Sequence, residues 1–190
     1  MSTRFDKVPR DLAGFLAWEN RQKGRYELVD GVVRLMSGGK LVHDLLSANA
    51  IYLLRASLGR SAFRVHGSNL KVVSPVGMVT YPDAFVRCGP ADEDVTEIAD
   101  PIVIVEVLSE RTRGHDLVAK RWAYQAIPTL QALVYVEPSV VGVELTTRLG
   151  PDRWQTRFFR SLDDTVTIQA IDAVVHLRDL YAGTRAGGGG

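Results

Sequence analysis

The chain has 190 residues, 46% of them hydrophobic, which suits a single domain with a sizeable core. Its formal net charge of +1 gives no overall basic field, so composition neither predicts nor excludes a nucleic-acid partner. The single cysteine, Cys88, excludes an intrachain disulfide and a four-cysteine zinc site, and it fits a reducing compartment. Residues 1–11 lack the apolar core of a signal peptide, and no stretch is long enough to cross a bilayer. We therefore expect a cytoplasmic protein without a membrane partner.

Three elements are predicted in the first third of the chain. Apolar residues at helical spacing after Asp11 predict a short helix that ends near residue 24. The segment 26–36 consists of two strand-like runs around Asp30-Gly31, a dipeptide that strongly favours a hairpin turn. Apolar residues recur at helical spacing from residue 41 to about 58, which predicts the longest helix.

The middle of the chain is predicted to form strands. Short apolar runs indicate strands at 63–65, 70–73 and 84–86, with a turn between the second and the third. The acid-rich segment 89–100 is typical of a solvated loop or a short helix. The run 102–108 is rich in β-branched residues, and this pattern predicts a strand buried on both faces.

The remaining elements complete one α/β domain over residues 1–181. A helix is predicted from residue 116 to 127, where Pro128 stops it, and it is followed by an apolar strand at 132–136. A strand, a helix and a returning strand predict a βαβ-like crossover. Later strands, at 140–148, 154–159 and 166–168, form an antiparallel extension before a short helix near 177–181. Residues 182–190 are predicted to be a disordered, glycine-rich tail.

Glu106 is the most informative residue, because it places an acid in the middle of the predicted buried strand. An ionised carboxylate in such a position is costly unless it is paired or bound to a metal. Asp83 follows Tyr81-Pro82 at the start of a neighbouring predicted strand, so the two acids form a candidate divalent-metal site. The structural alternatives are a buried salt bridge from Glu106 to Lys120 or Arg121, and a turn or strand cap for Asp83.

The helix after this strand carries Asp116, Lys120 and Tyr124 on one face, at positions i, i+4 and i+8. Together with the two acids, this helix face provides the residue types that a metal-dependent phosphodiesterase uses. Carboxylate oxygens suit Mg²⁺ or Mn²⁺, and an ammonium group can offset negative charge in the transition state. The structural alternative for Lys120 is an exposed ion pair with Asp116.

As an ordered set, these motifs resemble the Uma-two family, a group of restriction-endonuclease-like proteins within the PD-(D/E)XK nuclease superfamily. The similarity extends from about residue 25 to 137, with a looser fit to residue 181. The residues that carry the resemblance are Tyr26-Glu27-Leu28-Val29-Asp30-Gly31, His43, Tyr81-Pro82-Asp83, Asp100-Pro101, Val105-Glu106-Val107-Leu108-Ser109, Asp116, Lys120 and Tyr124.

The resemblance implies a restriction-endonuclease-like α/β core, in which a mixed central β-sheet is flanked by helices. It also implies that Asp83 and Glu106 are metal ligands and that the Val107 carbonyl completes the coordination. The sequence departs from the superfamily at Leu108, which stands where a lysine is expected two residues after the strand glutamate. Lys120 is our candidate for the missing lysine, because the family that the chain resembles places one on the following helix.

Five residues are supporting candidates: Asp116, which shares a helix face with Lys120, and the four that follow. Glu27 is by pattern an exposed strand residue, and only the resemblance brings it near the metal. His43 lies on the flank of the long helix, where a surface or hydrogen-bonded histidine is more common than a proton-transfer group. Tyr124 is expected to pack in the core. Ser109 is expected to cap the loop after the strand or to contact a phosphate, and no histidine near it in sequence indicates a serine enzyme.

Three arginines, Arg111, Arg113 and Arg121, cluster after the Glu106 strand as candidate phosphate contacts, although such clusters are often only a solvated face. Our leading hypothesis is a Mg²⁺- or Mn²⁺-dependent DNA endonuclease, most simply a homodimer if it cuts both strands of a duplex. The first alternative is a catalytically inactive nucleic-acid-binding or assembly module on the same fold. The second is a protein unrelated to nucleases, in which Glu106 forms only a structural ion pair.

Overall fold

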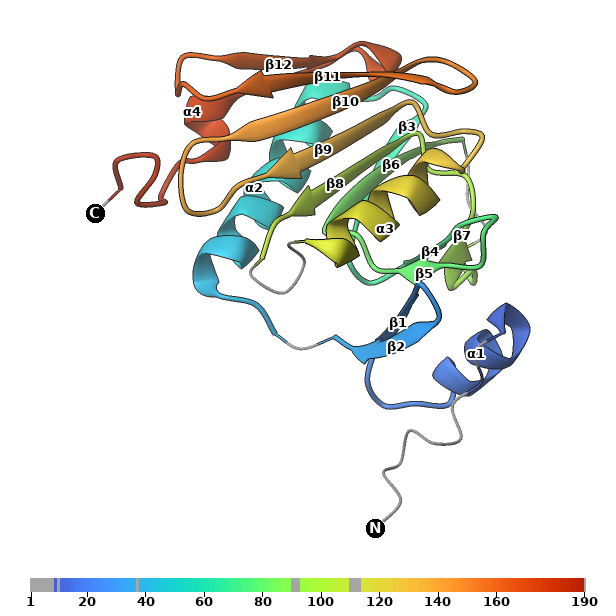
Figure 1. The fold of residues 1–190 in the computed structure, drawn as a ribbon. Coiled ribbons are helices and arrows are strands. Elements are labelled where there is room, and N and C mark those ends of the chain that lie inside the picture. The colour runs from blue at the N-terminus through green and yellow to red at the C-terminus, as the bar shows by residue number, and fades with distance from the viewer. Residues whose placement is uncertain (1–8, 10, 37, 90–92, 110–113, 190) are drawn as a thin grey trace.

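The computed structural model describes residues 9, 11–36, 38–89, 93–109 and 114–189, without the side chains of residues 115 and 116. Figure 1 shows the helices and strands of these ranges. The helices are α1 (Leu12–Glu19), α2 (Leu41–Leu58), α3 (His115–Gln125) and α4 (Leu177–Leu180), and a short 3-10 helix spans Gln169–Ile171. The strands are β1 (Tyr26–Val29), β2 (Val32–Leu35), β3 (Phe63–Gly67), β4 (Lys71–Val73), β5 (Val79–Thr80), β6 (Ala84–Cys88), β7 (Glu97–Ile98), β8 (Val103–Val107), β9 (Ala132–Val136), β10 (Val143–Gly150), β11 (Arg153–Phe159), β12 (Thr165–Ile168) and β13 (Ala173–His176).

A six-stranded mixed sheet forms the centre of the molecule, in the order β11-β10-β9-β8-β6-β3. β8 and β9 are parallel and are joined through α3, which confirms the predicted βαβ crossover. The other neighbouring pairs of this sheet are antiparallel. Because α2 lies on one face and α3 on the other (Figure 1), the predicted α/β class with a mixed central sheet flanked by helices is confirmed.

The two faces of the central sheet have separate cores, because side chains alternate between the faces along each strand. On one face, Val103, Val105 and Val107 of β8 pack with the apolar stripe of α2. On the other face, Ile104 packs with the buried residues of α3. Every residue of β8 is buried, as predicted for a strand covered on both sides. Glu106 points to the α3 side by the same alternation.

A second, five-stranded sheet has the order β2-β1-β5-β4-β7. Its β1–β2 hairpin turns at Asp30 and Gly31, with φ angles of 50° and 70°. Positive φ at both central residues is what a tight hairpin turn of this kind requires, which confirms the hairpin prediction. The segment 89–100, predicted to be a loop or a short helix, contains the two-residue strand β7, which pairs in parallel with β4. β5 was also not predicted, because two residues are too few to show a period.

The C-terminal part adds antiparallel structure, as predicted. β10 and β11 extend the central sheet as a hairpin, and β12 and β13 form a two-stranded sheet of their own. Residues 182–189 differ from the predicted disordered tail, because they form turns in which the Thr184 hydroxyl donates to the Tyr181 carbonyl. Gly187 permits this close approach, since a Cβ there would collide with that carbonyl. No helix in the described ranges has the length and apolar character to span a membrane.

Candidate active site

Glu106 faces α3 and is held there by a tyrosine and a threonine. The Tyr124 hydroxyl lies 2.6 Å from Glu106 Oε1 and 2.8 Å from Thr80 Oγ1. Both Tyr124 and Thr80 are fully buried, and Glu106 is 8% exposed. Tyr124 therefore packs in the core, as expected, and its hydroxyl also fixes the orientation of the acid. Sequence analysis did not identify Thr80, which lies on the short strand β5 of the other sheet.

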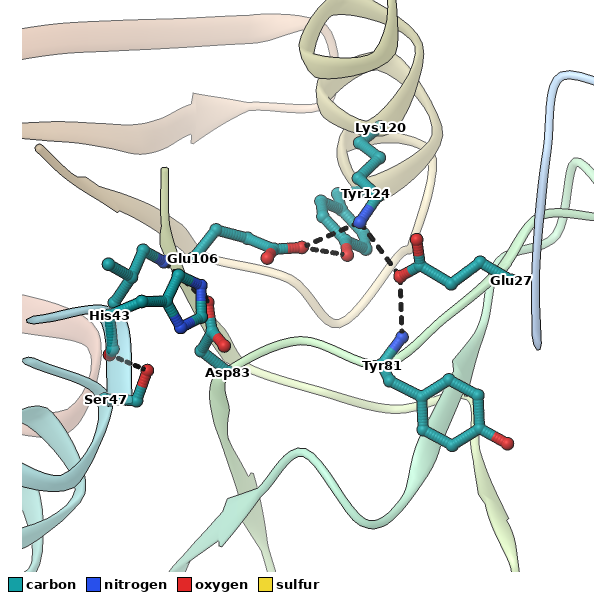
Figure 2. Close-up of polar contacts among 9 residues, drawn as sticks. Glu27, His43, Ser47, Tyr81, Asp83, Glu106, Lys120 and Tyr124 are labelled. Carbon is teal, nitrogen blue, oxygen red and sulfur yellow. Dashed lines mark hydrogen bonds and ion pairs between the residues drawn. The ribbon is translucent and has the colours of Figure 1, made fainter. Parts of the chain in front are cut away.

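Lys120 reaches the same carboxylate from one turn earlier in α3. Its ammonium nitrogen lies 2.9 Å from Glu27 Oε1 and 3.6 Å from Glu106 Oε1 (Figure 2). Lys120 is only 4% exposed, so the alternative of an exposed ion pair with Asp116 is wrong. Glu27 is 8% exposed and accepts the Tyr81 backbone N–H at 3.1 Å, so the expectation of an exposed Glu27 is also wrong.

Asp83 and His43 meet beside the end of β8. Asp83 Oδ2 accepts the Val107 backbone N–H at 2.7 Å and lies 3.4 Å from His43 Nε2. Asp83 thus accepts a backbone N–H, as expected if it were a turn or strand cap. It also lies next to β8, the strand that contains Glu106. The hydrogen bond to Asp83 raises the pKa of His43 above its usual value, and this effect exceeds the opposing effect of burial. The sequence could not show that His43 contacts Asp83, because this contact depends on how α2 packs on the sheet.

The site has more buried acid than base. The ammonium group of Lys120 lies beside the carboxylates of Glu27 and Glu106, and the imidazole of His43 lies beside that of Asp83, so three carboxylates face two basic groups. Burial is the main cause that raises the pKa of Glu106 to about 7; Lys120 opposes this increase, and the nearby Asp83 and Glu27 contribute to it. A bound cation would favour the ionised form of Glu106, and carboxylate oxygens are ligands that Mg²⁺ and Mn²⁺ prefer.

The donors near Glu106 therefore fit a divalent cation in their chemistry. Within the described ranges, no group of three or more His, Cys, Asp or Glu side chains is placed to hold a metal. The carboxylates of Asp83 and Glu106 are two oxygen donors close to the end of β8. Mg²⁺ commonly binds in this way, through one or two carboxylates and several waters.

The structure brings seven of the predicted site residues together: Glu27, His43, Asp83, Glu106, Val107, Lys120 and Tyr124. Arg121 is turned elsewhere, because its guanidinium lies 2.6 Å from Glu144 on β10 and not on Glu106. Arg111, Arg113 and the side chain of Asp116 lie outside the described residues. Ser109 lies just beyond β8, and its phosphate contact stays a prediction.

A second buried polar cluster adjoins the site, and sequence analysis missed it. Glu19, at the end of α1, accepts the Tyr81 hydroxyl at 2.6 Å and pairs with Lys71 on β4 at 2.6 Å. Tyr81 touches both clusters, since its backbone N–H binds Glu27 while its hydroxyl binds Glu19. No local pattern could have found this cluster, because Glu19 is more than fifty positions away from both Lys71 and Tyr81 in the sequence.

Comparisons with known proteins found similar sequences. The sequence model of the Uma2 family, described as "Putative restriction endonuclease", matches residues 12–177. The chain is 30% identical over 151 residues to the uncharacterized protein slr1290 of Synechocystis sp. (strain ATCC 27184 / PCC 6803 / Kazusa), covering 78% of this chain and 80% of that protein. It is 25% identical over 146 residues to the uncharacterized protein sll1609 of the same organism, covering 75% and 82% of the two chains.

A solved structure has a similar fold. It is described as "a putative nuclease belonging to DUF820" from Anabaena variabilis ATCC 29413, with a TM-score of 0.74 at 17% sequence identity. The match covers 92% of this chain and 98% of that one. At this level of identity, the likeness concerns the fold alone.

Proposed function

Because the chain belongs to the Uma2 family, described as "Putative restriction endonuclease", we propose that it is a metal-dependent endonuclease that hydrolyses phosphodiester bonds of DNA. One observation carries the proposal. Lys120 approaches Glu106 to 3.6 Å from α3, at the end of β8 where the Val107 N–H binds Asp83. Two acids and a lysine thus meet although Leu108 occupies the strand position at which the superfamily has its lysine.

Asp83 and Glu106 would hold Mg²⁺ or Mn²⁺, which when bound supplies charge stabilisation at the scissile phosphate and lowers the pKa of the attacking water. The excess of buried acid supports this assignment, because an isolated structural ion pair would leave one acid for one base. Tyr124 and Thr80 keep the Glu106 carboxylate in one orientation. His43 restrains Asp83 from the other side, where it lies 3.4 Å from Asp83 Oδ2.

Lys120 is the proposed electrostatic group of the reaction. In the hydrolysis, a water oxygen attacks phosphorus, a P–O ester bond breaks, and the products are a phosphate monoester and an alcohol. Negative charge develops on the phosphate oxygens, and a buried ammonium nearby stabilises it more than an exposed one would. Glu27 holds this ammonium in place at 2.9 Å. Arg111 and Arg113 remain candidate phosphate contacts, whereas the Arg121 guanidinium is paired with Glu144.

The test is cleavage of supercoiled plasmid and of single-stranded DNA in Mg²⁺, Mn²⁺ or EDTA. We expect cutting with either metal and none in EDTA. Glu106→Gln and Asp83→Asn should each lower the rate about a hundredfold or more, because each removes a charged oxygen ligand. A homodimer that acts on both strands would give linear plasmid, whereas a monomer would give nicked circles.

The matched control is Glu19→Gln, which changes a second buried glutamate that pairs with a buried lysine. At temperatures where it is folded, this variant should cut at the wild-type rate. Equal cutting by wild type and Glu106→Gln would contradict the proposal.

A second candidate function is a catalytically inactive nucleic-acid-binding or assembly module. Leu108 favours it, because loss of the strand lysine is one way in which this chemistry could be lost. It predicts that the wild-type protein binds DNA and leaves the plasmid intact with either metal.

A further inference from the structure

A row of side chains leads from Glu106 to the edge of the central sheet. In the register of the sheet, Glu106 is opposite Tyr135, Tyr135 is opposite Glu144, and Glu144 is opposite Phe158. Directly opposed residues project from the same face, so all four lie on the α3 side. Three strand spacings of about 4.8 Å each place Phe158 roughly 14 Å from the candidate site.

The α3 side is covered near the site and open near the edge. The buried residues of α3 pack on β6, β8 and β9, and β10 and β11 extend beyond the helix (Figure 1). Phe158 is 59% exposed although it lies within a regular strand. The Arg160 guanidinium lies 5.2 Å from the centre of its ring. Glu144, the acid within the row beyond Glu106, is neutralised by Arg121 at 2.6 Å.

The charge of this edge favours a polyanion. Residues 153–160 contain no acid, and of their three arginines Arg160 lies over the Phe158 ring, whereas alternation directs Arg153 and Arg157 to the opposite face. The next acids along the chain are already engaged, because Asp163 pairs with Arg178 and Asp164 accepts the backbone N–H groups of Arg160 and Ser161. Exposed aromatic rings between cations are the usual means of holding a single nucleic-acid strand, in which bases stack and phosphates pair with arginine.

We propose that Phe158 and Arg160 form an outer binding track for a single strand of nucleic acid, with Phe158 stacking a base and Arg160 holding a phosphate. This inference rests on the proposed function, because the track lies on the same face of the sheet as Glu106, roughly 14 Å away.

The test measures binding in EDTA, so it does not depend on cutting. Fluorescence anisotropy would compare a labelled oligothymidine with an abasic phosphodiester chain of the same length. Stacking predicts that the wild type binds the oligothymidine more tightly, and that Phe158→Ala weakens this binding about tenfold while leaving the abasic chain unchanged. Arg160→Ala should weaken both and reduce the slope of log affinity against log salt by about 0.7.

Arg157→Ala is the matched control. This arginine is exposed on the same strand and lies 5.3 Å from the centre of another ring, that of Phe159, but alternation directs it to the opposite face. It should change affinity less than about twofold. The variants should keep the wild-type melting temperature, because the three substituted side chains are exposed.

The track is overturned if wild type does not bind, if Phe158→Ala binds the oligothymidine like wild type, or if Arg157→Ala weakens binding as much. It is also overturned if polyglutamate competes as well as DNA, since the edge would then suit acidic peptides, or if Phe158→Ala changes only the oligomeric state.

If wild type cuts plasmid while the track variants bind normally, the track alone fails. If binding behaves as expected and no plasmid is cut, the nuclease proposal alone fails.

Discussion

Two buried clusters in this molecule contain the same three side-chain types, a glutamate, a lysine and a tyrosine, but differ in their balance of charge. In the first, Glu19 accepts hydrogen bonds from Lys71 and from the Tyr81 hydroxyl, each at 2.6 Å. Asn20 supplies Lys71 with another acceptor, also at 2.6 Å. One acid faces one base, so the cluster is complete and holds the end of α1 against the second sheet.

The second cluster surrounds Glu106 and is not balanced. Lys120 is shared between Glu27 and Glu106, Tyr124 donates to Glu106, and Asp83 adds a further carboxylate close by. Burial and the neighbouring acids raise the pKa of Glu106 to about 7.

The comparison shows what distinguishes a structural ion pair from a candidate site in the same fold. A buried pair that is satisfied by its own hydrogen bonds needs no further partner, whereas buried acids in excess are destabilised until a cation or a proton joins them.

Replacement of the lysine in each cluster should affect the cleavage rate differently. Lys120→Met should lower the plasmid-cleavage rate about 10³-fold, because it removes the positive charge beside the reacting phosphate. Lys71→Met should keep the wild-type rate per folded molecule, since Lys71 lies outside the site. Initial rates of supercoiled-plasmid loss, corrected for the folded fraction by circular dichroism, provide the measurement. A similar loss of rate in both variants would remove the proposed distinction.

Neutralisation of the glutamate in each cluster should change the free energy of unfolding by different amounts. Glu19→Gln should lower the free energy of unfolding by about 3 kcal/mol, because Lys71 remains buried without a counter-charge. Glu106→Gln should change it by less than about 1 kcal/mol in metal-free buffer, because Lys120 keeps Glu27 as its partner. Urea denaturation of the two variants and the wild type gives both values. If Glu106→Gln costs as much as Glu19→Gln, Glu106 is a structural ion-pair residue.

Magnesium should stabilise only proteins with an intact second cluster. At a Mg²⁺ concentration one hundred times the dissociation constant, the wild type should gain about 2.7 kcal/mol. Glu19→Gln should gain the same amount, whereas Asp83→Asn and Glu106→Gln should gain almost none. Thermal melts across a magnesium titration measure this gain. A melting temperature that does not respond to magnesium in the wild type would argue against a metal site.

The smallest effect concerns pH. The pKa of Glu106 is about 7 in the folded chain against a usual value of 4.5, so between these values the folded state holds a proton that the unfolded state has lost. Stability therefore decreases as pH rises through this range. Relative to Glu106→Gln, the metal-free wild type should lose at least about 1 kcal/mol between pH 5 and pH 7. Parallel pH profiles of the two proteins would contradict the raised pKa.

Local sequence patterns were sufficient to predict most of the fold. The β-branched run predicted β8, the Asp30-Gly31 turn predicted the β1–β2 hairpin, and helical spacing predicted the bounds of α2. These patterns are reliable because hydrophobic periodicity and turn chemistry act over a few neighbouring residues. The two-residue strands β5 and β7 escaped prediction, because backbone pairing to distant segments defines them.

The sequence alone identified Glu106, since a carboxylate inside a buried strand is unusual for local reasons. The sequence pattern also paired it with Asp83 and placed Lys120 on the following helix, and the family resemblance implied that the two acids are metal ligands and that Lys120 replaces the missing lysine. Only the tertiary structure decided that Glu27 is buried against Lys120, that His43 meets Asp83, and that Glu19 and Lys71 form a balanced pair. Glu27 and Lys120 are 93 positions apart, and such contacts depend on how two sheets and two helices pack, which no local period encodes. The excess of acid at the candidate site became visible only when these distant side chains were placed together.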